Sequence, residues 1–319
     1  MIDTDSKTVA RIFAILSAIF YAQGLFFVKR CTLTDVHTVI IFRSITNVIM
    51  SVMHGKANGV KLFVGWQSSN GLIIRGCFAI MASAGSMLAT QYLTLSVFGV
   101  FTRLEMMTLM ITGILFMGNK FDINVLVTIL LCIFGVTLVI APSLYGLGEK
   151  EDLSLKWNYN DFVGLGLATI WLIGDTTQIA ITTKILVGGS TTVFHAVFYQ
   201  SLILLIFIAL LVIYNGVPVI YYWDDLFNYF GVSISMYLGT YLAAESYRVE
   251  KDLGVQTILE SPYAIAFFFY DAVFFGTEIS AANWFGCFLV VASALWAVYL
   301  AHRKDRVIDS HAIDHQIDV

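Results

Sequence analysis

The sequence predicts an all-α membrane protein whose ten transmembrane helices form two inverted five-helix repeats. The 319-residue chain is 58% hydrophobic and only 13% charged, with a mean hydropathy of +0.81, which places it outside the range of soluble domains. Its apolar stretches are long and continuous rather than alternating, which favours spanning helices over a membrane barrel. The lipid bilayer is therefore the first partner that the composition predicts.

An internal repeat with an offset of 155 residues predicts the division into two halves. Residues 76–105 and 231–260, aligned without gaps, share nine identities in thirty positions, against about two expected by chance. The last matching positions are the acids Glu105 and Glu260, and the same offset pairs Gln23 with Gln178. Because each repeat holds an odd number of helices, the second copy enters the bilayer from the opposite side.

Apolar segments bounded by turn-forming residues predict the helices in order. The connection between the third and fourth segments, near Thr94, is so short that these two helices must form a tight antiparallel hairpin. Small residues at 82–86 permit close helix approach. The predicted helices span 9–28, 36–53, 72–93, 95–117, 123–141, 161–184, 190–213, 228–248, 253–275 and 279–301.

These segments divide the chain into an N-terminal tail (1–8), a first repeat (9–141), an inter-repeat loop (142–160), a second repeat (161–301) and a C-terminal tail (302–319). The first apolar run is too long for a cleaved signal, so we expect a retained helix. Eleven Lys and Arg residues lie on the side of both termini and four on the other, which predicts a multi-pass protein with both termini cytoplasmic. Plasma membrane and endomembrane both remain open.

Ionisable side chains within the apolar segments are the main candidates for function. Each costs roughly 2.5–3.5 kcal/mol at mid-bilayer, so such residues usually face a bundle interior or a water-filled cavity. They are Arg43, Arg75, Arg103, Glu105, Asp175, Glu245, Glu260 and Asp271, joined by His195.

Glu105 and Glu260 come first because the repeat places them at equivalent depths. Each carboxylate is predicted either to exchange a proton or to bind a cationic substrate group. The alternative is an ion pair between helices, with Arg43 or Arg75 as the partner of Glu105. Pro262 follows Glu260 closely and should kink its helix, which frees polar backbone near Glu260. A packing kink without a ligand is the alternative.

Arg43 lies midway along the second helix, where it is either an anion-binding residue or the partner of an acid. His195 and Tyr199 share one face of the seventh helix, which can bind a substrate or serve packing only. Asp175 and Asp271 have no repeat counterparts and are expected to be structural. The full set of candidate substrate-binding residues is Gln23, Arg43, Glu105, Gln178, His195, Tyr199, Gln200, Glu260 and Tyr263.

Several chemistries find no support in the sequence. It contains no Walker-type glycine loop, HExxH, GxSxG or paired CxxC motif, so we expect neither an enzyme nor a cofactor or metal site. The four cysteines form no disulfide framework. A small-molecule substrate is the expected partner, with no nucleic acid, and a homodimer remains open.

Two segments at helix ends carry a family resemblance. Phe116-Met117-Gly118-Asn119-Lys120 and Phe274-Phe275-Gly276-Thr277-Glu278, together with the ten-helix pattern, the third-to-fourth hairpin and the arginine of the second helix, resemble the drug/metabolite transporter superfamily, in particular its EamA-like branch. Members typically have Phe-Gly-Glu at these ends. Here the acid is displaced by one position after Gly276 and is missing after Gly118.

The resemblance implies alternating-access transport of a small polar metabolite, such as an amino-acid-like solute. Nucleotide-sugar transporters of solute carrier family 35 are related, and Phe198-Tyr199-Gln200-Ser201 is similar to their Phe-Tyr-Asn-Asn stretch, with both asparagines replaced. Their ninth-helix lysine has no counterpart near Glu260. A nucleotide-sugar or sugar-phosphate antiporter of an endomembrane is therefore the alternative, and a non-transporting scaffold or receptor is the alternative of another class.

Overall fold

The structure of the protein is a computed structural model that describes residues 7–117, 123–145, 159–187, 189, 191–250, 253–260, 262–276, 281, 284–293, 295–296 and 299–300. Within these ranges the regular secondary structure is entirely helical. The C-terminal tail, most of the N-terminal tail and inter-repeat loop, the segment after Met117, the Thr277-Glu278 pair and the side chain of Arg103 lie outside the described residues.

The described helices follow the predicted apolar segments closely, and each of the first eight segments corresponds to one helix. Residues Trp284–Ser293, within the tenth predicted segment, are also helical. The helices are α1 (Lys7–Arg30), α2 (Val36–Ala57), α3 (Trp66–Tyr92), α4 (Leu95–Met117), α5 (Ile123–Tyr145), α6 (Tyr159–Val187), α7 (Val193–Asn215), α8 (Leu226–Val249, preceded by the 3-10 turn η1, Trp223–Asp225), α9 (Leu253–Leu259) and α10 (Pro262–Phe274).

Five helices are long and apolar enough to cross a membrane: Lys7–Arg30, Val36–Ala57, Ser69–Tyr92, Phe162–Val187 and Val193–Asn215. Many large apolar side chains point outward, among them Leu210, Ile213 and Leu115, whereas several charged side chains are buried. This distribution is the reverse of that in soluble domains, where charged residues are almost never fully buried. The chain is therefore an all-helical membrane protein.

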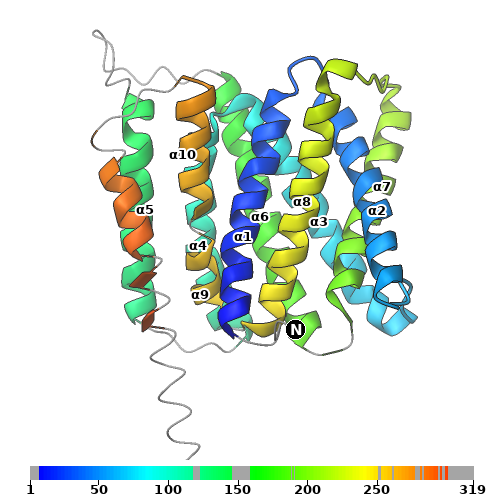
Figure 1. Ribbon diagram of the computed structural model, residues 1–319, viewed down its shortest axis with the longest axis horizontal. Coiled ribbons are helices and arrows are strands. Elements are labelled where there is room, and N and C mark those ends of the chain that lie inside the picture. The colour runs from blue at the N-terminus through cyan, green and yellow to red at the C-terminus, as the bar shows by residue number, and fades with distance from the viewer. Residues whose placement is uncertain are drawn as a thin grey trace, which may run out of the picture.

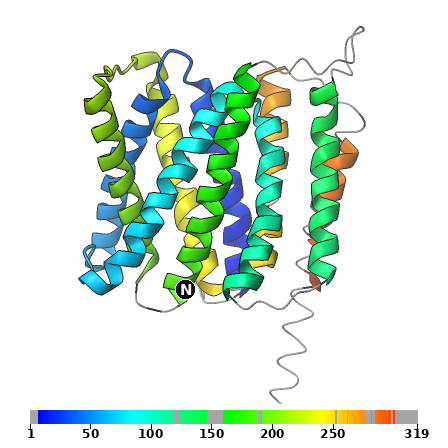
Figure 2. The same ribbon diagram turned by 180° about the vertical axis from the view of Figure 1, so that it is seen from behind.

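The long helices lie side by side and run in alternating directions through the molecule (Figure 1). Helices α1, α6 and α8 occupy the middle, with α2 and α7 on one side and α5 on the other. The view from behind shows α3 crossing close to α6 (Figure 2). The most extensive helix contacts join α3 to α6 and α1 to α8, and α2 packs on α7.

Glycine permits the close approach of α3 to α6. A Cβ atom on Gly174 of α6 would lie 2.6 Å from the backbone nitrogen of Ala82, and one on Gly85 of α3 would lie 2.9 Å from the backbone nitrogen of Trp171. Real Cβ atoms essentially never come this close to backbone. The small-residue stretch 82–86 therefore allows helix contact as predicted, with α6 contributing Gly174 from the opposite side.

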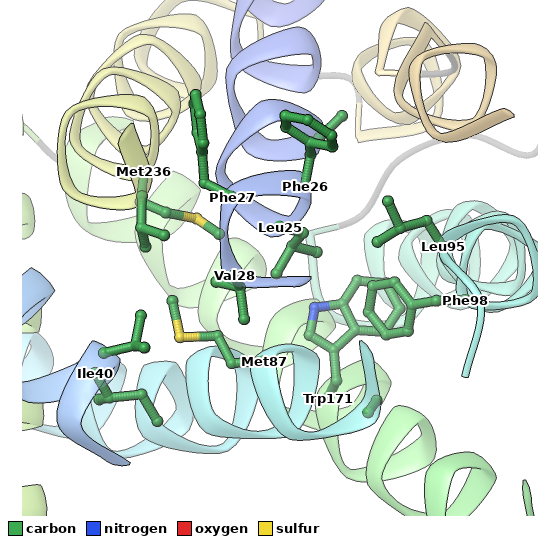
Figure 3. Close-up of a cluster of buried hydrophobic side chains, with 14 of the residues drawn as sticks. Leu25, Phe26, Phe27, Val28, Ile40, Met87, Leu95, Phe98, Trp171 and Met236 are labelled. Carbon is green, nitrogen blue, oxygen red and sulfur yellow. The ribbon is translucent and has the colours of Figure 1, made fainter. Parts of the chain in front are cut away.

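Apolar side chains from both halves of the chain fill one end of the bundle. Leu25, Phe26, Phe27 and Val28 of α1 belong to a buried cluster with side chains from α2, α3, α4, α6 and α8 (Figure 3). Trp171 of α6 packs against Phe98 of α4, with their ring centroids 5.0 Å apart. This cluster holds the central helices together next to the polar interior described below.

The segment predicted as a ninth helix is broken at its proline. Helix α9 ends at Leu259, Glu260 forms a turn, and α10 begins at Pro262. Proline has no N–H and clashes with the preceding turn, which explains why the helix cannot continue through this point. The sequence predicted a kink in one continuous helix at this point, whereas the structure has two helices, α9 and α10, on either side of Glu260.

Candidate functional site

A polar cavity lies between the helices, with a volume of about 80 Å³. Its walls come from α1, α2, α3, α4, α6, α7 and α8 and from the α9–α10 junction. The ionisable and polar side chains that line it are Tyr21, Arg43, Arg75, Ser83, Ser86, Glu105, Asp175, Gln178, Thr182, Gln200, Thr240, Tyr247, Glu260 and Tyr263. Side chains far apart in the sequence therefore meet at one buried site.

Two acids from different helices meet in this cavity. Glu105 of α4 is buried, and its carboxyl group lines the same cavity as that of Asp175 of α6. Gln178, one turn further along α6, donates a hydrogen bond from Nε2 to Oδ1 of Asp175. The neighbours at positions i and i+3 lie on the same helix face, which is why both reach the cavity.

The third acid, Glu260, lies at the break between α9 and α10. Its Oε1 accepts a hydrogen bond of 2.8 Å from the hydroxyl of Tyr247 and one of 3.4 Å from Nε2 of Gln256. Gln256 is itself held by Ser246, whose Oγ lies 2.8 Å from Oε1 of Gln256. The carboxyl group therefore stays in contact with α8 although its own helix is interrupted.

Arg75 of α3 donates hydrogen bonds to two neutral acceptors. Its Nε donates to Oγ1 of Thr182 on α6, and its Nη1 donates to the carbonyl oxygen of Ala196 on α7 at 2.7 Å. Asp175 adds an electrostatic attraction from α6. Arg75 thus ties three helices together at the edge of the cavity.

Arg43 of α2 is in a different situation. Its side chain is only 3% exposed, and its one hydrogen-bond contact among the described residues is a weak one of 3.8 Å to Sδ of Met87. Its Nε has no partner within the described part of the chain. A buried cation without a counter-charge is costly, so the site favours an anionic or strongly accepting group beside Arg43.

Two glutamines that line the cavity each have a side-chain oxygen that accepts no hydrogen bond in the described part of the chain. Gln178 is 8% exposed and Gln200 is 4% exposed, and neither Oε1 has a hydrogen-bond partner among the described side and main chains. Buried polar atoms are nearly always hydrogen-bonded in folded proteins. The unpaired polar atoms of Arg43, Gln178 and Gln200 come from three helices around one cavity. They therefore indicate that a polar solute or water occupies that space.

The cavity brings together most of the predicted site residues but not all of them. The predicted site residues that line the cavity are Arg43, Glu105, Gln178, Gln200, Glu260 and Tyr263. Neither Arg43 nor Arg75, the two arginines expected as partners of Glu105, makes an ion pair with it in the described part of the chain.

Gln23, His195 and Tyr199 lie outside the lining of this cavity. His195 accepts a hydrogen bond from the backbone N–H of Thr192 at 3.0 Å and lies 2.7 Å from the carbonyl oxygen of Lys61, so it caps α7 and holds the loop before α3. Tyr199 packs in a cluster with Leu72. A binding role for these residues stays a prediction.

Sequence reasoning missed several residues of the cavity. Asp175 was expected to be structural because it lacks a repeat counterpart, yet it shares the cavity with Glu105. The spacing of Asp175 and Gln178 on one helix face was the available signal. Tyr247 had a signal too, since it repeats Tyr92, whereas Tyr21 had none.

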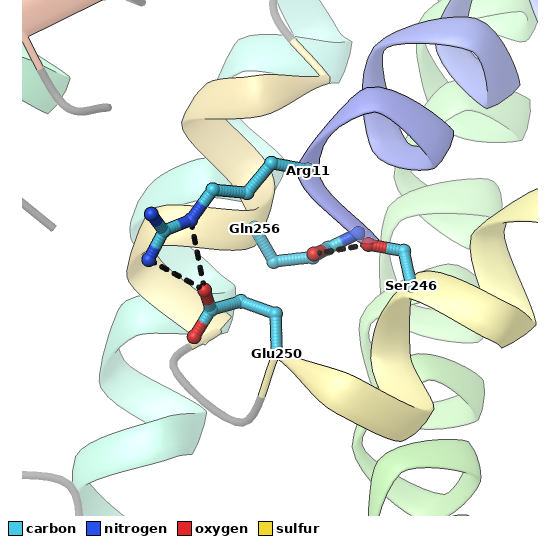
Figure 4. Close-up of polar contacts among 4 residues, drawn as sticks. All are labelled: Arg11, Ser246, Glu250 and Gln256. Carbon is cyan, nitrogen blue, oxygen red and sulfur yellow. Dashed lines mark hydrogen bonds and ion pairs between the residues drawn. The ribbon is translucent and has the colours of Figure 1, made fainter. Parts of the chain in front are cut away.

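A buried ion pair lies at the end of the bundle near the start of α1. The guanidinium group of Arg11 donates from Nε and Nη2 to Oε2 of Glu250, at 3.2 and 3.1 Å (Figure 4). The two side chains are 9% and 8% exposed. The contact between Ser246 and Gln256 lies beside it (Figure 4). This end is therefore closed by polar contacts between α1, the end of α8 and α9.

Comparison with known proteins identifies the fold alone. No family model and no curated protein sequence matches the chain. A solved structure described only as "Crystal structure of protein" resembles it with a TM-score of 0.74 and 12% sequence identity, covering 93% of this chain and 100% of that one. The whole helical arrangement, rather than a part of it, therefore exists in a protein whose structure has been solved.

Proposed function

We propose that this protein is a secondary active transporter that moves a small polar metabolite by alternating access. The observation that carries the proposal is the buried cavity with vacant polar groups on Arg43, Gln178 and Gln200. A membrane protein gains no stability from such groups, because each lost its hydration when the helices packed. They become favourable when a polar solute fills their hydrogen-bonding capacity.

The arrangement of the helices supports the inverted repeat that alternating access uses. The 155-residue offset relates α1 to α6 and α3 to α8, so the contacts α1 with α8 and α6 with α3 are exchanged copies of one another. Helix α2 packs on α7, which is its own counterpart. In this proposal the ten predicted helices form two five-helix halves, and the cavity lies between them.

The broken helix adds further support. Broken helices at membrane depth are characteristic of transport sites, because they leave polar backbone beside the solute. Here the break between α9 and α10 falls at Glu260, which lines the cavity. The loop charges described above place both termini in the cytoplasm in this proposal, with the cavity near the middle of the bilayer.

The size of the cavity favours a small metabolite over a nucleotide sugar. Its volume of about 80 Å³ is well below the roughly 300–1,000 Å³ of typical ligand pockets. An amino-acid-like or similar small solute needs much less opening of the helices than a nucleotide with a sugar. The buried charges also argue against a scaffold or receptor, which needs no charge at this depth.

The proposal is tested by ligand-dependent stabilisation of the purified protein in lipid. Amino acids, polyamines, sugar phosphates and nucleotide sugars are each added, and thermal unfolding is measured. A solute at a hundredfold excess over its Kd should stabilise the folded state by about 2.7 kcal/mol. Compounds that stabilise are then tested for uptake into proteoliposomes.

Two variants separate the cavity from the rest of the molecule. Arg43→Gln should abolish the stabilisation by solute, because it removes the cation that faces the cavity. Arg248→Gln, which changes an arginine paired with Glu245 outside the cavity lining, should keep it. Absence of both stabilisation and uptake for every class of solute would contradict the proposed transport and favour the scaffold or receptor.

A further inference from the structure

Arg43 is a buried cation of the cavity that lacks a strong hydrogen-bond acceptor in the described part of the chain. Its Nε is unpaired there, and its Nη1 contacts Sδ of Met87 at 3.8 Å. A thioether sulfur is a weak acceptor, and Met87 packs with Val28 and Ile40 in the apolar cluster (Figure 3). This contact brings no negative charge to the guanidinium group, which is therefore left to bind an acceptor from outside the protein.

The donors around the cavity determine which anion fits beside Arg43. Five hydroxyl groups of the lining already donate hydrogen bonds, two to side chains and three to backbone carbonyl groups. They are Tyr21, Ser86, Thr182, Thr240 and Tyr247. One guanidinium group can bind both oxygens of a carboxylate in a planar, bidentate contact, whereas a phosphate has three oxygens that need donors. The donors of Arg43 therefore favour a carboxylate over a phosphate.

The cavity also offers hydrogen-bond acceptors. Nε2 of Gln178 donates to the carboxyl group of Asp175, which fixes the amide and leaves its Oε1 as the remaining group. This oxygen and Oε1 of Gln200 are both buried, and neither has a donor within the residues that the structure describes. A carboxylate cannot serve them, because it has no hydrogen to donate. The solute therefore needs an O–H or N–H group in addition to its carboxylate.

Smaller occupants satisfy only part of this set. Water can donate to the glutamine oxygens, but it is neutral and leaves the charge of Arg43 uncompensated. A chloride ion supplies the charge but has no hydrogen to donate. A hydroxy acid or an amino acid supplies both groups in one molecule, and the cavity volume of about 80 Å³ favours one with few carbon atoms.

The cation and the acceptors come from different predicted repeats. Arg43 lies on α2 in the first repeat, whereas Gln178 lies on α6 and Gln200 on α7 in the second. Helix α2 packs on α7. A solute bound to both kinds of group therefore joins the two halves that move relative to each other in alternating access.

We propose that the cavity binds a small carboxylic acid that carries a hydroxyl or amino group. Its carboxylate binds the guanidinium group of Arg43, and its O–H or N–H group donates to the side-chain oxygens of Gln178 and Gln200. The inference rests on the proposed transport function and names its substrate class. It makes these three residues the ones that determine specificity.

Wild-type protein alone tests the substrate class. The purified full-length protein in lipid is titrated with acetamide, acetate and glycolate at constant ionic strength, and each Kd is obtained from the rise in unfolding temperature. Acetate should bind about tenfold or more tightly than acetamide, because a hydrogen bond between charged groups is stronger than one between neutral groups. Glycolate should bind about two- to tenfold more tightly than acetate, because its hydroxyl group reaches a glutamine oxygen. Glycine tests the amino form of the same group.

Three results in wild-type protein overturn the inference. The first is acetate that binds no better than acetamide. The second is glycolate and glycine that both bind no better than acetate. The third is chloride that binds as tightly as glycolate, which would mean that the site takes a simple anion. None of these comparisons depends on a variant that has to fold.

Variants assign each part of the solute to its residue. Arg43→Gln should remove the preference for acetate over acetamide, and Arg43→Lys should keep part of it, because lysine retains the charge without the planar fork. Gln178→Met and Gln200→Met should each reduce the advantage of glycolate over acetate, and the double variant should abolish it. Preferences that survive these changes overturn the assignment.

Matched controls come from outside the cavity lining. Arg248→Gln removes an arginine that is paired with Glu245, and Gln23→Met removes a glutamine of α1. Both variants should keep the preference for acetate and the advantage of glycolate. A loss in either control equal to that in the cavity variants would show that the effect is general, and it would overturn the assignment.

The binding site and the transport function can fail separately. If glycolate binds through Arg43 but no compound enters proteoliposomes, the proposed function fails and the binding site stands. If a transported solute has no carboxylate, or if its uptake is unchanged by Arg43→Gln, the transport function stands and this inference is overturned.

Discussion

Arg11 and Arg43 are both buried in this protein, but their guanidinium groups have different partners. Arg11 makes two hydrogen bonds to one oxygen of Glu250 at the end of the bundle. Within the described part of the chain, Arg43 makes only a weak contact with the sulfur of Met87, and it lines the cavity. Counted over the whole residue, their exposed fractions are similar, at 7% for Arg11 and 3% for Arg43. Burial therefore does not distinguish them, and the counter-charge does.

The partners of these two arginines predict opposite effects on stability. The charge of Arg11 stabilises the fold, whereas the charge of Arg43 destabilises it. Removing one member of a buried pair is strongly destabilising because the other charge is left uncompensated. A buried charge that has no counter-charge is already in that state, so its removal relieves a cost. Substitutions near Arg11 should therefore lower the stability of the fold. Substitutions in the cavity should instead weaken the binding of its solute.

The largest expected effect is at the closed end. Glu250→Gln should lower the free energy of unfolding by about 3–5 kcal/mol, because it removes the charged acceptor of the buried Arg11 guanidinium group. Unfolding of the reconstituted protein by denaturant or heat measures the change. Replacing both residues together, Arg11→Met with Glu250→Leu, should recover most of the loss. A single variant as stable as the wild type would show that this contact adds nothing to the fold.

The second effect has the opposite sign. Without solute, Arg43→Gln should raise the free energy of unfolding, by up to about 2.5 kcal/mol on insertion scales, because it removes a buried charge. Arg75→Gln is the matched comparison, since Arg75 lines the same cavity but donates to Thr182 and Ala196. It should lower stability. Equal losses in both variants would mean that Arg43 is held as firmly as Arg75.

A neutral contact beside the ion pair gives a smaller effect. Ser246→Ala leaves Oε1 of Gln256 without its donor, and both side chains are fully buried, so we expect a loss of about 1–3 kcal/mol. Ser233→Ala on the same helix is the control, because Ser233 donates to a backbone carbonyl of Tyr229. It should cost less. Thermal unfolding measures both losses. A larger loss for Ser233→Ala than for Ser246→Ala would show that the contact between Ser246 and Gln256 is not the main polar contact of α8.

The smallest effect is expected at a partly exposed ion pair. Arg248 and Glu245 lie 3.0 Å apart on α8, with side chains 35% and 15% exposed. Arg248→Gln should cost less than about 1 kcal/mol, and the difference should shrink at high salt. If Arg248→Gln lowered stability as much as Glu250→Gln, the exposed fraction of an ion pair would not explain how much that pair stabilises this protein.

Much of this molecule could be predicted from its sequence because bilayer physics acts on local composition. The long apolar segments are helical in the structure. Pro262, which follows Glu260, lies where α9 and α10 are separated. Arg43, Glu105 and Glu260 were found because charge in an apolar segment is conspicuous. Their partners were not found, because pairing depends on how each helix is rotated and which helices adjoin.

Two cases show this limit. Asp175 lacks a repeat counterpart, and only the packing of α6 against α4 brings it to Glu105. Arg11 is one of the eleven Lys and Arg residues that predict the orientation of the chain, and the structure pairs it with Glu250. Local sequence does not show which helices adjoin, so it predicts neither contact.

The pairing of Arg11 with Glu250 also has a consequence for how the chain is made. The two residues are 239 positions apart, so at about 5–20 residues per second Glu250 follows Arg11 from the ribosome by roughly 12 to 48 seconds. Helix α1 makes its most extensive contact with α8, which is completed just before Glu250. During that interval the guanidinium group, close to the start of its helix, has to reach water or lipid headgroups. Helix α1, the earliest of the described helices to be made, is therefore among the last to be docked.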